Sequence, residues 1–299
     1  MTSYQSLQKG MFGLFSPMVK SSVARYIQSR QPDLCVSVHP LMNHLGLQWV
    51  AHAGLDIPFI TVVTDMVSFH PSWICPQVDR CLVPTEEARK RALSFGMPPE
   101  KLAVHGQPVG LKFARLDGNK SRWKTRIGLD PQRAAILLIG GGEGYGQMYR
   151  IARRLAATVQ GSQLIVVAGR NKKLKERLEK TCWGIPTRIY GFVDNMPELM
   201  AAADLLVTKA GPGTISEAFI AGLPLILSGY IPGQETGNVH YVRNKKAGVY
   251  SRSSKKIARL AQEWVEGSSA VFQELVGNAN RLARPNASLD IASDICRFL

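Results

Sequence analysis

The chain has 299 residues, of which 45% are hydrophobic and 20% are charged. This composition is typical of globular proteins and excludes a disordered chain, and the length is enough for two domains with buried cores. The formal net charge is +15, so we expect an anionic partner: nucleic acid, a phosphorylated substrate or an acidic membrane surface. No apolar run approaches the roughly 18 residues that a spanning helix needs, so we expect a protein that lies on a membrane at most.

The N-terminal segment is basic. The first acidic residue is Asp33, and residues 1–32 contain several serines, the composition of an organellar transit peptide. The apolar positions between Met18 and Ile27, however, have helical spacing, and Pro32 ends the run. We therefore predict a helix there rather than a transit peptide.

Two kinds of segment then alternate along the chain. Short runs rich in Val, Ile and Leu predict buried parallel strands at 34–38, 59–63, 82–83, 134–139, 164–168, 187–189, 205–208 and 224–227. Helical patterns lie between them at 43–53, 86–95, 147–157, 172–180, 197–202 and 215–221. This alternation predicts an α/β fold built from doubly wound parallel sheets.

The weakest periodicity lies between about Val109 and Lys124, and we interpret it as the linker between two domains. The predicted domains are residues 1–115 and 116–299. Only three clear strands precede the linker, so the first domain is expected to be incomplete. A helical tail follows from Lys255, and Pro285 interrupts it before a last amphipathic segment.

A glycine run, Gly140-Gly141-Gly142-Glu143-Gly144, follows the strand at 134–139 directly. Without side chains, the backbone amides of such a turn can approach a phosphate or a sugar, which makes Gly141, Gly142 and Glu143 candidate donor-binding residues. It is not a dinucleotide fingerprint, because no acidic residue closes a strand about 20 positions later. The alternative is an ordinary tight turn between strand and helix.

The second candidate, Thr208-Lys209-Ala210-Gly211-Pro212-Gly213-Thr214, also lies between a strand and a helix. Free amides at a helix start suit a diphosphate, and Lys209 adds a full positive charge. Glu217, one turn into the helix, could accept hydrogen bonds from a ribose diol. Thr214 and Glu217 also fit a capping box, which would satisfy the helix start without a ligand.

Two further segments follow predicted strands. Pro232-Gly233-Gln234-Glu235, with Asn238 after it, offers side chains that could bind sugar hydroxyls in pairs, although a plain polar loop has the same composition. The backbone of Gly191-Phe192-Val193 could pair with the edge of a base, although a core Phe explains this segment equally well.

The predicted N-terminal domain contributes candidates of its own. Asp65 follows a strand and His70 lies five residues later, so the two could act together in proton transfer. Trp73 could meet a lipid or a sugar, because indole has an apolar body and a polar tip. His39, after another strand, is a second acceptor candidate. The five cysteines form no CxxC pair or zinc spacing, and no HExxH, GxSxG or Walker signature occurs, so no metal site is expected.

The sequence resembles the monogalactosyldiacylglycerol synthases in seven segments that occur in this order: SVHPLMNHLGL, TVVTDMVSFHPSW, GGGEGYG, AGRNKKL, GFVDNM, TKAGPGTISEA and PGQETGNVHYV. These enzymes are inverting glycosyltransferases, and the resemblance covers roughly residues 31–249. It implies a GT-B fold, in which two Rossmann-like domains face a cleft. The C-terminal domain would bind a UDP-sugar, and the N-terminal domain would meet the membrane and the acceptor.

The resemblance also implies roles for the candidate residues. Gly191, Phe192 and Val193 would contact uracil, Glu217 the ribose, and Trp73 the acceptor lipid. The diphosphate would lie at the helix start formed by Gly211, Pro212, Gly213 and Thr214. The transferred sugar would be held by Gln234, Glu235 and Asn238. No bound metal is needed for this chemistry, because helix amides and basic residues stabilise the departing UDP.

The implied reaction moves galactose or glucose from UDP to the 3-hydroxyl of 1,2-diacylglycerol, with inversion, on the cytoplasmic face of a membrane. The family begins with a glycine-rich loop that carries a His, and residues 1–32 contain no such loop. Asp65 or His70 therefore becomes the leading candidate for the general base. Three alternatives stay open: a polyprenyl-linked acceptor, a homodimer, or a donor-binding fragment that pairs with a separate N-terminal subunit. A nucleic-acid partner is not expected, since no binding motif accompanies the charge.

Overall fold

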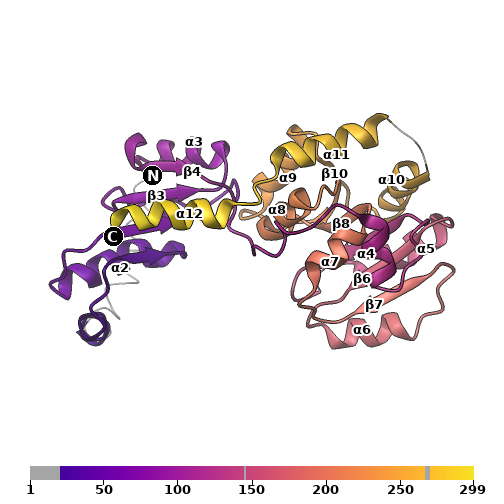
Figure 1. The fold of residues 1–299 in the computed structure, drawn as a ribbon, viewed down its shortest axis with the longest axis horizontal. Helices are drawn as coiled ribbons and strands as arrows, with labels where there is room; N and C mark the ends of the chain where they lie inside the picture. Colours follow the sequence, from indigo (N-terminus) through magenta and orange to yellow (C-terminus); the bar gives the residue numbers. More distant parts are fainter. Residues whose placement is uncertain (1–20, 145, 267–269) are drawn as a thin grey trace. The chain divides into compact units, whose positions relative to one another are not determined.

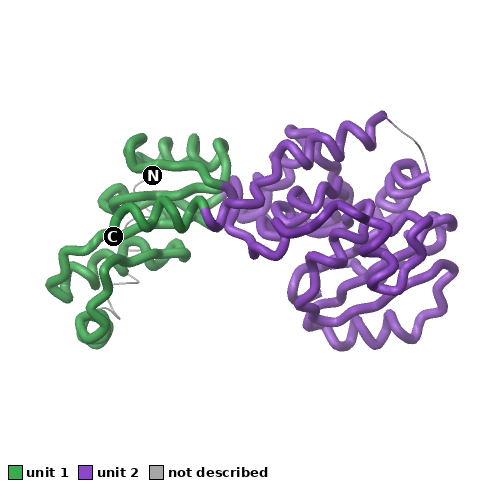
Figure 2. Tube along the Cα trace, viewed as in Figure 1, with its two compact units in different colours: residues 1–64, 69–105, 290–299 green, residues 65–68, 106–289 purple. Residues whose placement is uncertain are grey.

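The computed structural model describes residues 21–144, 146–266 and 270–299, which form two compact units (Figure 2). Unit 1 contains the described residues up to Thr64, together with Phe69–His105 and Asp290–Leu299. Unit 2 contains Asp65–Ser68 and Gly106–Leu289. The sequence analysis placed a single boundary between residues 115 and 116, whereas the chain passes into unit 2 after His105 and returns to unit 1 at Asp290.

Unit 1 is built on a four-stranded parallel sheet (Figure 1). Its strands lie in the order β1 (Cys35–Ser37), β2 (Phe59–Val62), β3 (Arg80–Val83) and β4 (Leu102–Val104). Its helices are α2 (Pro40–His52), α3 (Glu86–Ser94) and the 3-10 turns η1 (Pro71–Trp73), η2 (Pro99–Lys101) and η3 (Cys296–Phe298). Residues 21–30 are helical, as predicted, whereas Met18 and Val19 lie outside the described residues.

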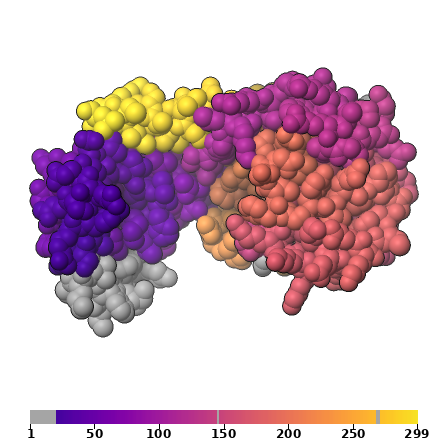
Figure 3. Space-filling model, turned by 60° about the horizontal axis from the view of Figure 1, so that its bottom comes forward, coloured from indigo at the N-terminus to yellow at the C-terminus, as the bar shows by residue number. Residues whose placement is uncertain are grey.

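The last helix of the chain, α12 (Ala287–Ile295), covers one face of this sheet. Ile291 of α12 packs against Ile60, Val62 and Leu82 of the two central strands. Asp294, 3% exposed, accepts hydrogen bonds from Arg80 and His105. In Figure 3 the yellow C-terminal residues accordingly lie on the indigo and purple residues of unit 1.

Unit 2 contains a six-stranded parallel sheet in the order β10-β9-β8-β5-β6-β7. The strands are β5 (Ala135–Ile139), β6 (Gln163–Val167), β7 (Thr187–Tyr190), β8 (Leu205–Lys209), β9 (Leu225–Gly229) and β10 (Gly248–Tyr250). From β5 the chain builds outward to β7, then returns to place β8 on the other side of β5. In sheets of this kind the ligand crevice lies outside the carboxyl ends of the strands at that reversal.

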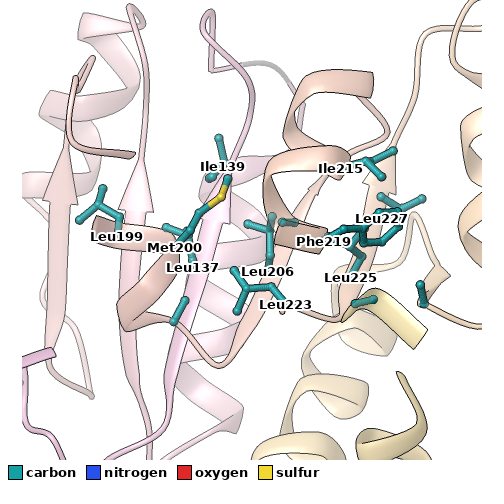
Figure 4. Packing of buried hydrophobic residues seen from close by; sticks show 14 of the residues in the cluster. Leu137, Ile139, Leu199, Met200, Leu206, Ile215, Phe219, Leu223, Leu225 and Leu227 are labelled. Carbon is teal, nitrogen blue, oxygen red and sulfur yellow. The ribbon is translucent and has the colours of Figure 1, made fainter. Parts of the chain in front are cut away.

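Helices cover both faces of the second sheet because alternate strand residues point to opposite sides. On one face Ile136 and Val207 pack against α5 (Met148–Thr158), α6 (Lys172–Glu179) and α10 (Ser254–Glu266). On the other, Leu137 and Leu206 pack against α7 (Met196–Ala202), α8 (Pro212–Ile220) and α9 (Thr236–Asn244), as Figure 4 shows for α7 and α8. Helix α11 (Ala270–Leu282) packs along α8. No helix of the described residues is long and apolar enough to cross a bilayer.

Two segments predicted to be irregular are partly helical. The second half of the predicted linker forms α4 (Lys120–Arg126), which packs on α7. Its side chains are mostly polar, so the apolar periodicity that identifies helices is missing. Asn119 accepts a hydrogen bond from the Arg122 amide, and Lys120 and Lys124 both pair with Asp204. Helix α9 likewise begins at Thr236, so Asn238 lies on a helix rather than in a loop.

Candidate functional site

The carboxyl ends of β5, β6 and β7, together with α7 and α8, enclose a recess in unit 2. It contains about 410 Å³ of space, including solvent at its mouth. Its lining residues are Ile139, Gly141, Gly142, Val167, Gly169, Phe192, Val193, Met196, Met200, Thr214 and Glu217. Three of the segments predicted to contact a ligand therefore meet at the strand-order reversal.

The glycine run after β5 packs backbone to backbone against the turn after β6. Gly169 has a φ of +61°, and a Cβ built on it would lie 2.3 Å from the Gly142 carbonyl oxygen. The Arg170 amide donates to that same oxygen at 2.7 Å. A Cβ on Gly144 would lie 2.2 Å from the Ala168 oxygen. Gly144 and Gly169 are thus required by the turn itself, and Gly141, Gly142 and Gly169 line the recess.

Helix α8 presents an uncapped start beside this turn. Gly211 is the N-cap residue and makes no side-chain cap, and Pro212 has no amide hydrogen. In the described part of the chain the amides of Gly213 and Thr214 find no acceptor. Thr214 is the third residue of the helix, so the capping box considered as an alternative is wrong. The positive end of the helix dipole is open to an anionic group.

Glu217 is the acidic residue of the recess. Burial raises the pKa of its carboxyl group, and the positive charge of Lys112 opposes this rise. The residues around it in the recess are mainly apolar, among them Ile139, Val193 and Met200. A carboxylate held in such surroundings is stabilised by any donor that hydrogen-bonds to its charged form.

The rim of the recess carries two tethers to the segment between β7 and α7. The Arg170 guanidinium lies 4.5 Å from the ring centroid of Phe192, which is 63% exposed, and it pairs with Glu143 at 2.9 Å. On the same segment, the Lys112 ammonium donates to the Asp194 carbonyl oxygen. The Arg170–Glu143 pair is exposed and therefore adds little stability.

Family models match both parts of the chain. The model described as monogalactosyldiacylglycerol (MGDG) synthase matches residues 2–109, and that of the glycosyltransferase family 28 C-terminal domain matches residues 135–270. The MGDG synthase of Spinacia oleracea is 41% identical over 303 residues, which cover 98% of this chain and 58% of that protein. MGDG synthase 1 of Arabidopsis thaliana is 39% identical over 303 residues, covering 98% of this chain and 57% of the relative. The chain is thus similar to MGDG synthases over nearly its whole length.

The chain spans a little over half the length of the two relatives. Solved structures with the same fold include S. aureus MnaA with UDP (TM-score 0.69, 16% identity, 95% of this chain and 80% of that one). Acinetobacter baumannii MurG has a TM-score of 0.66 at 16% identity, with 93% and 78% of the two chains covered. HepE of Anabaena with UDP-glucose has a TM-score of 0.61 at 15% identity, with 96% and 84% covered. These similarities confirm the predicted GT-B type of fold.

The resemblance to MGDG synthases assigned sugar contacts to Gln234, Glu235 and Asn238, and the structure separates the three. Glu235 is 2% exposed, pairs with the Lys209 ammonium through one oxygen, and accepts from the Ile231 amide at 2.8 Å through the other. Asn238 is 1% exposed and donates to the Ala210 carbonyl at 2.9 Å. Both bond to groups that frame the start of α8, and their contact with a sugar stays a prediction.

Gln234, by contrast, reaches the Asp65 carboxylate. Its side-chain amide donates to Asp65 Oδ1 at 3.2 Å, and both residues belong to unit 2. The turn holding Gln234 is fixed by a hydrogen bond from the Gly233 amide to the Thr236 hydroxyl at 3.1 Å. One predicted general base thus lies next to one predicted sugar ligand.

Three other candidate residues lie in unit 1. Trp73 is 2% exposed and belongs to the hydrophobic core, and its contact with the acceptor stays a prediction. His70 caps η1, and its Nδ1 accepts from the Ser72 amide at 3.2 Å. Its role as a general base stays a prediction. His39 is exposed and caps α2 by accepting from the Leu41 amide at 3.3 Å.

Sequence reasoning missed Lys112, Arg170 and the two methionines of α7. Arg170 follows β6 at the edge where the other motifs meet, so the rule on strand ends could have identified it. Met196 and Met200 carry the ordinary pattern of a core helix. Lys112 lies in the predicted linker, where no pattern marks it. Among the described residues, no three His, Cys, Asp or Glu side chains gather closely enough to hold a metal ion.

Proposed function

We propose that this chain is an inverting glycosyltransferase that moves galactose or glucose from a UDP-sugar to the 3-hydroxyl of 1,2-diacylglycerol. The observation that carries the proposal is the recess of unit 2, where glycine turns, the uncapped start of α8 and Glu217 meet at the reversal of strand order. Similarity to the MGDG synthases supports the choice of acceptor.

The recess suits a uridine diphosphate in three ways. Glu217 can accept hydrogen bonds from a ribose diol, and the amides of Gly213 and Thr214 offer two donors to the diphosphate. The exposed ring of Phe192 lies at the rim, where a base can stack on it or pair with the neighbouring backbone. HepE and MnaA, which share this fold, were solved with UDP-glucose and UDP.

In the proposed reaction the acceptor hydroxyl attacks the anomeric carbon on the face opposite UDP, and a base removes its proton. Asp65 is our candidate for this base, because it lies beside Gln234, the proposed sugar ligand. The leaving diphosphate carries the developing negative charge, which the amides at the start of α8 stabilise without a metal ion. We further propose that the protein acts on the cytoplasmic face of a membrane, with its +15 charge attracted to anionic lipids.

A transfer assay tests the whole proposal. The purified chain is incubated with vesicles containing diacylglycerol and with labelled UDP-galactose or UDP-glucose, and labelled glycolipid is separated from free sugar. We expect a monohexosyl product from one of the two donors. Donor binding without product would instead support a donor-binding unit that needs a further polypeptide, and transfer only to a polyprenyl phosphate acceptor would contradict the choice of diacylglycerol.

A single methyl group tests the position of the diphosphate. A Cβ built on Gly213 meets nothing within 4 Å and Gly213 does not have a positive φ, so Gly213→Ala is expected to fold normally. If the diphosphate lies against this amide, the methyl group takes up its space, and the dissociation constant for UDP rises about tenfold, or about 1.4 kcal/mol. Gly161→Ala is the matched control, since Gly161 is equally open but lies in the turn before β6. Equal UDP affinity of both variants would show that the diphosphate does not bind at this helix start.

A further inference from the structure

Lys112 is held at a fixed point beside the recess. It lies in a turn stabilised by hydrogen bonds from the Phe113 amide to Gly110 at 3.0 Å and from the Ala114 amide to Leu111 at 3.1 Å. The neighbouring Phe113 is 3% exposed and belongs to the core of unit 2. The backbone of Lys112 therefore does not depend on its own side chain for its position.

The side chain of Lys112 connects two walls of the recess. Its ammonium donates to the carbonyl oxygen of Asp194, just after Phe192 and Val193, which line the recess. Its positive charge also acts on Glu217, where it lowers a pKa that burial raises. A carbonyl is neutral, and no carboxylate of the described residues forms an ion pair with Lys112, so its full charge is available to Glu217.

The other charged groups on the elements around α8 have partners of their own. On β8, Lys209 pairs with Glu235. On α7, Glu198 pairs with Arg126 at 3.3 Å. On α11, Glu274 pairs with Lys246 at 3.1 Å, and Arg281 donates to the side chain of Asn278. Lys112 is accordingly the cation through which the described protein acts on Glu217.

We propose that Lys112 is a positioning residue for the donor nucleotide: it anchors the segment of Phe192 and Val193 and sets its positive charge beside the recess in which Glu217 receives the ribose diol. This inference rests on the proposed donor site and adds to it a residue that does not itself contact the nucleotide. The chemistry is that of a charge-assisted hydrogen bond, which requires the ionised carboxylate.

The test is the pH dependence of UDP binding, measured by calorimetry between pH 5.5 and 8.5. Wild-type affinity is expected to rise with pH until Glu217 is ionised. Lys112→Met is expected to move this midpoint to higher pH, with about tenfold weaker binding on the acid side for each pH unit of displacement. Lys112→Arg retains the charge and is expected to restore the wild-type profile. Lys246→Met, an exposed lysine of the same unit, is the matched control.

Two results separate this role from others. In a Glu217→Gln background the pH-dependent loss caused by Lys112→Met is expected to vanish, since the group through which it acts is gone. A loss of equal size at every pH, which a direct phosphate ligand or a purely structural tether would give, overturns the proposal. Unchanged binding overturns it as well.

A measurement without ligand keeps this inference distinct from the proposed function. The side-chain ¹³C signal of Glu217, assigned by its absence in Glu217→Gln, is titrated in the free wild type and in Lys112→Met. We expect a higher midpoint in the variant, and equal midpoints refute the role of Lys112. Failure of the wild type to bind UDP would refute the proposed donor site instead.

Discussion

Glu217 is expected to strengthen donor binding and to lower the stability of the folded protein. The substitution Glu217→Gln measures these two effects separately. The substitution keeps the shape of the side chain and removes its charge. A carboxylate that accepts hydrogen bonds from a ribose diol is stronger than an amide in that role, so UDP binding should weaken by about 1–3 kcal/mol, or about five- to 150-fold in Kd.

The stability of the free protein should change in the opposite direction. Burial raises the pKa of Glu217 in the folded state, with partial opposition from Lys112, so the unfolded chain releases the proton more readily. The destabilising contribution of this group is therefore small below its ordinary pKa, about 4.3, and grows as pH rises through the folded-state pKa. At pH 7.5 Glu217→Gln is expected to be more stable than the wild type, and at pH 4.5 the difference should shrink.

Denaturant unfolding at both pH values, combined with UDP titration at pH 7.5, measures both quantities. Glu274→Gln is the control, because Glu274 is exposed on α11 and pairs only with the exposed Lys246. A variant that is less stable than the wild type at pH 7.5, with unchanged UDP affinity, would mean that Glu217 has a structural role and that the recess binds something other than a ribose.

Three further substitutions test the architecture around the site. Gly169→Ala places a Cβ 2.3 Å from the Gly142 oxygen at a positive φ and should lower the free energy of unfolding by at least 1–2 kcal/mol, or about the strain of a left-handed residue, in denaturant titration. Asp294→Asn leaves Arg80 without its buried partner and should destabilise unit 1 by about 3–5 kcal/mol. Burial alone would raise the pKa of Asp294, yet the bonds from Arg80 and His105 hold it low, so this stabilisation should be lost as pH falls into the acid range. Trp73→Ala should cost about 3–5 kcal/mol of stability, as expected for a core aromatic; an unchanged midpoint of thermal unfolding would return Trp73 to the surface.

The buried strands and the strand-end motifs were predictable because their signals are local. Runs such as 134–139 and 205–208 are apolar and are followed by turns that contain glycine, and the rule on carboxyl ends brings these turns together. The short strands β4 and β10 gave no such signal, since each has three residues and little apolar periodicity. The segment of α4 lacks an apolar stripe and is held by ion pairs to Asp204, a contact that depends on tertiary structure.

Within the site, residue type was predictable and surroundings were not. Glu217 and Glu235 are both acidic residues near strand ends, and only the fold distinguishes a carboxylate that lines a recess from one buried against Lys209. The burial of Trp73 was missed for a related reason, because a Trp residue in the sequence is the same whether it lies in a core or at a lipid surface. Lys112 escaped notice because its importance depends on two groups, Asp194 and Glu217, that are distant in the sequence.

The return of α12 to unit 1 has a consequence for how the protein is made. Unit 2 is inserted, in sequence order, between the strands of unit 1 and the helix that covers them. As the polypeptide leaves the ribosome, Ile60, Val62 and Leu82 emerge early, yet their partner Ile291 follows more than 200 residues later. One apolar face of the first sheet therefore stays exposed until α12 has been synthesised. A nascent chain stalled in this interval should be the species that chaperones bind.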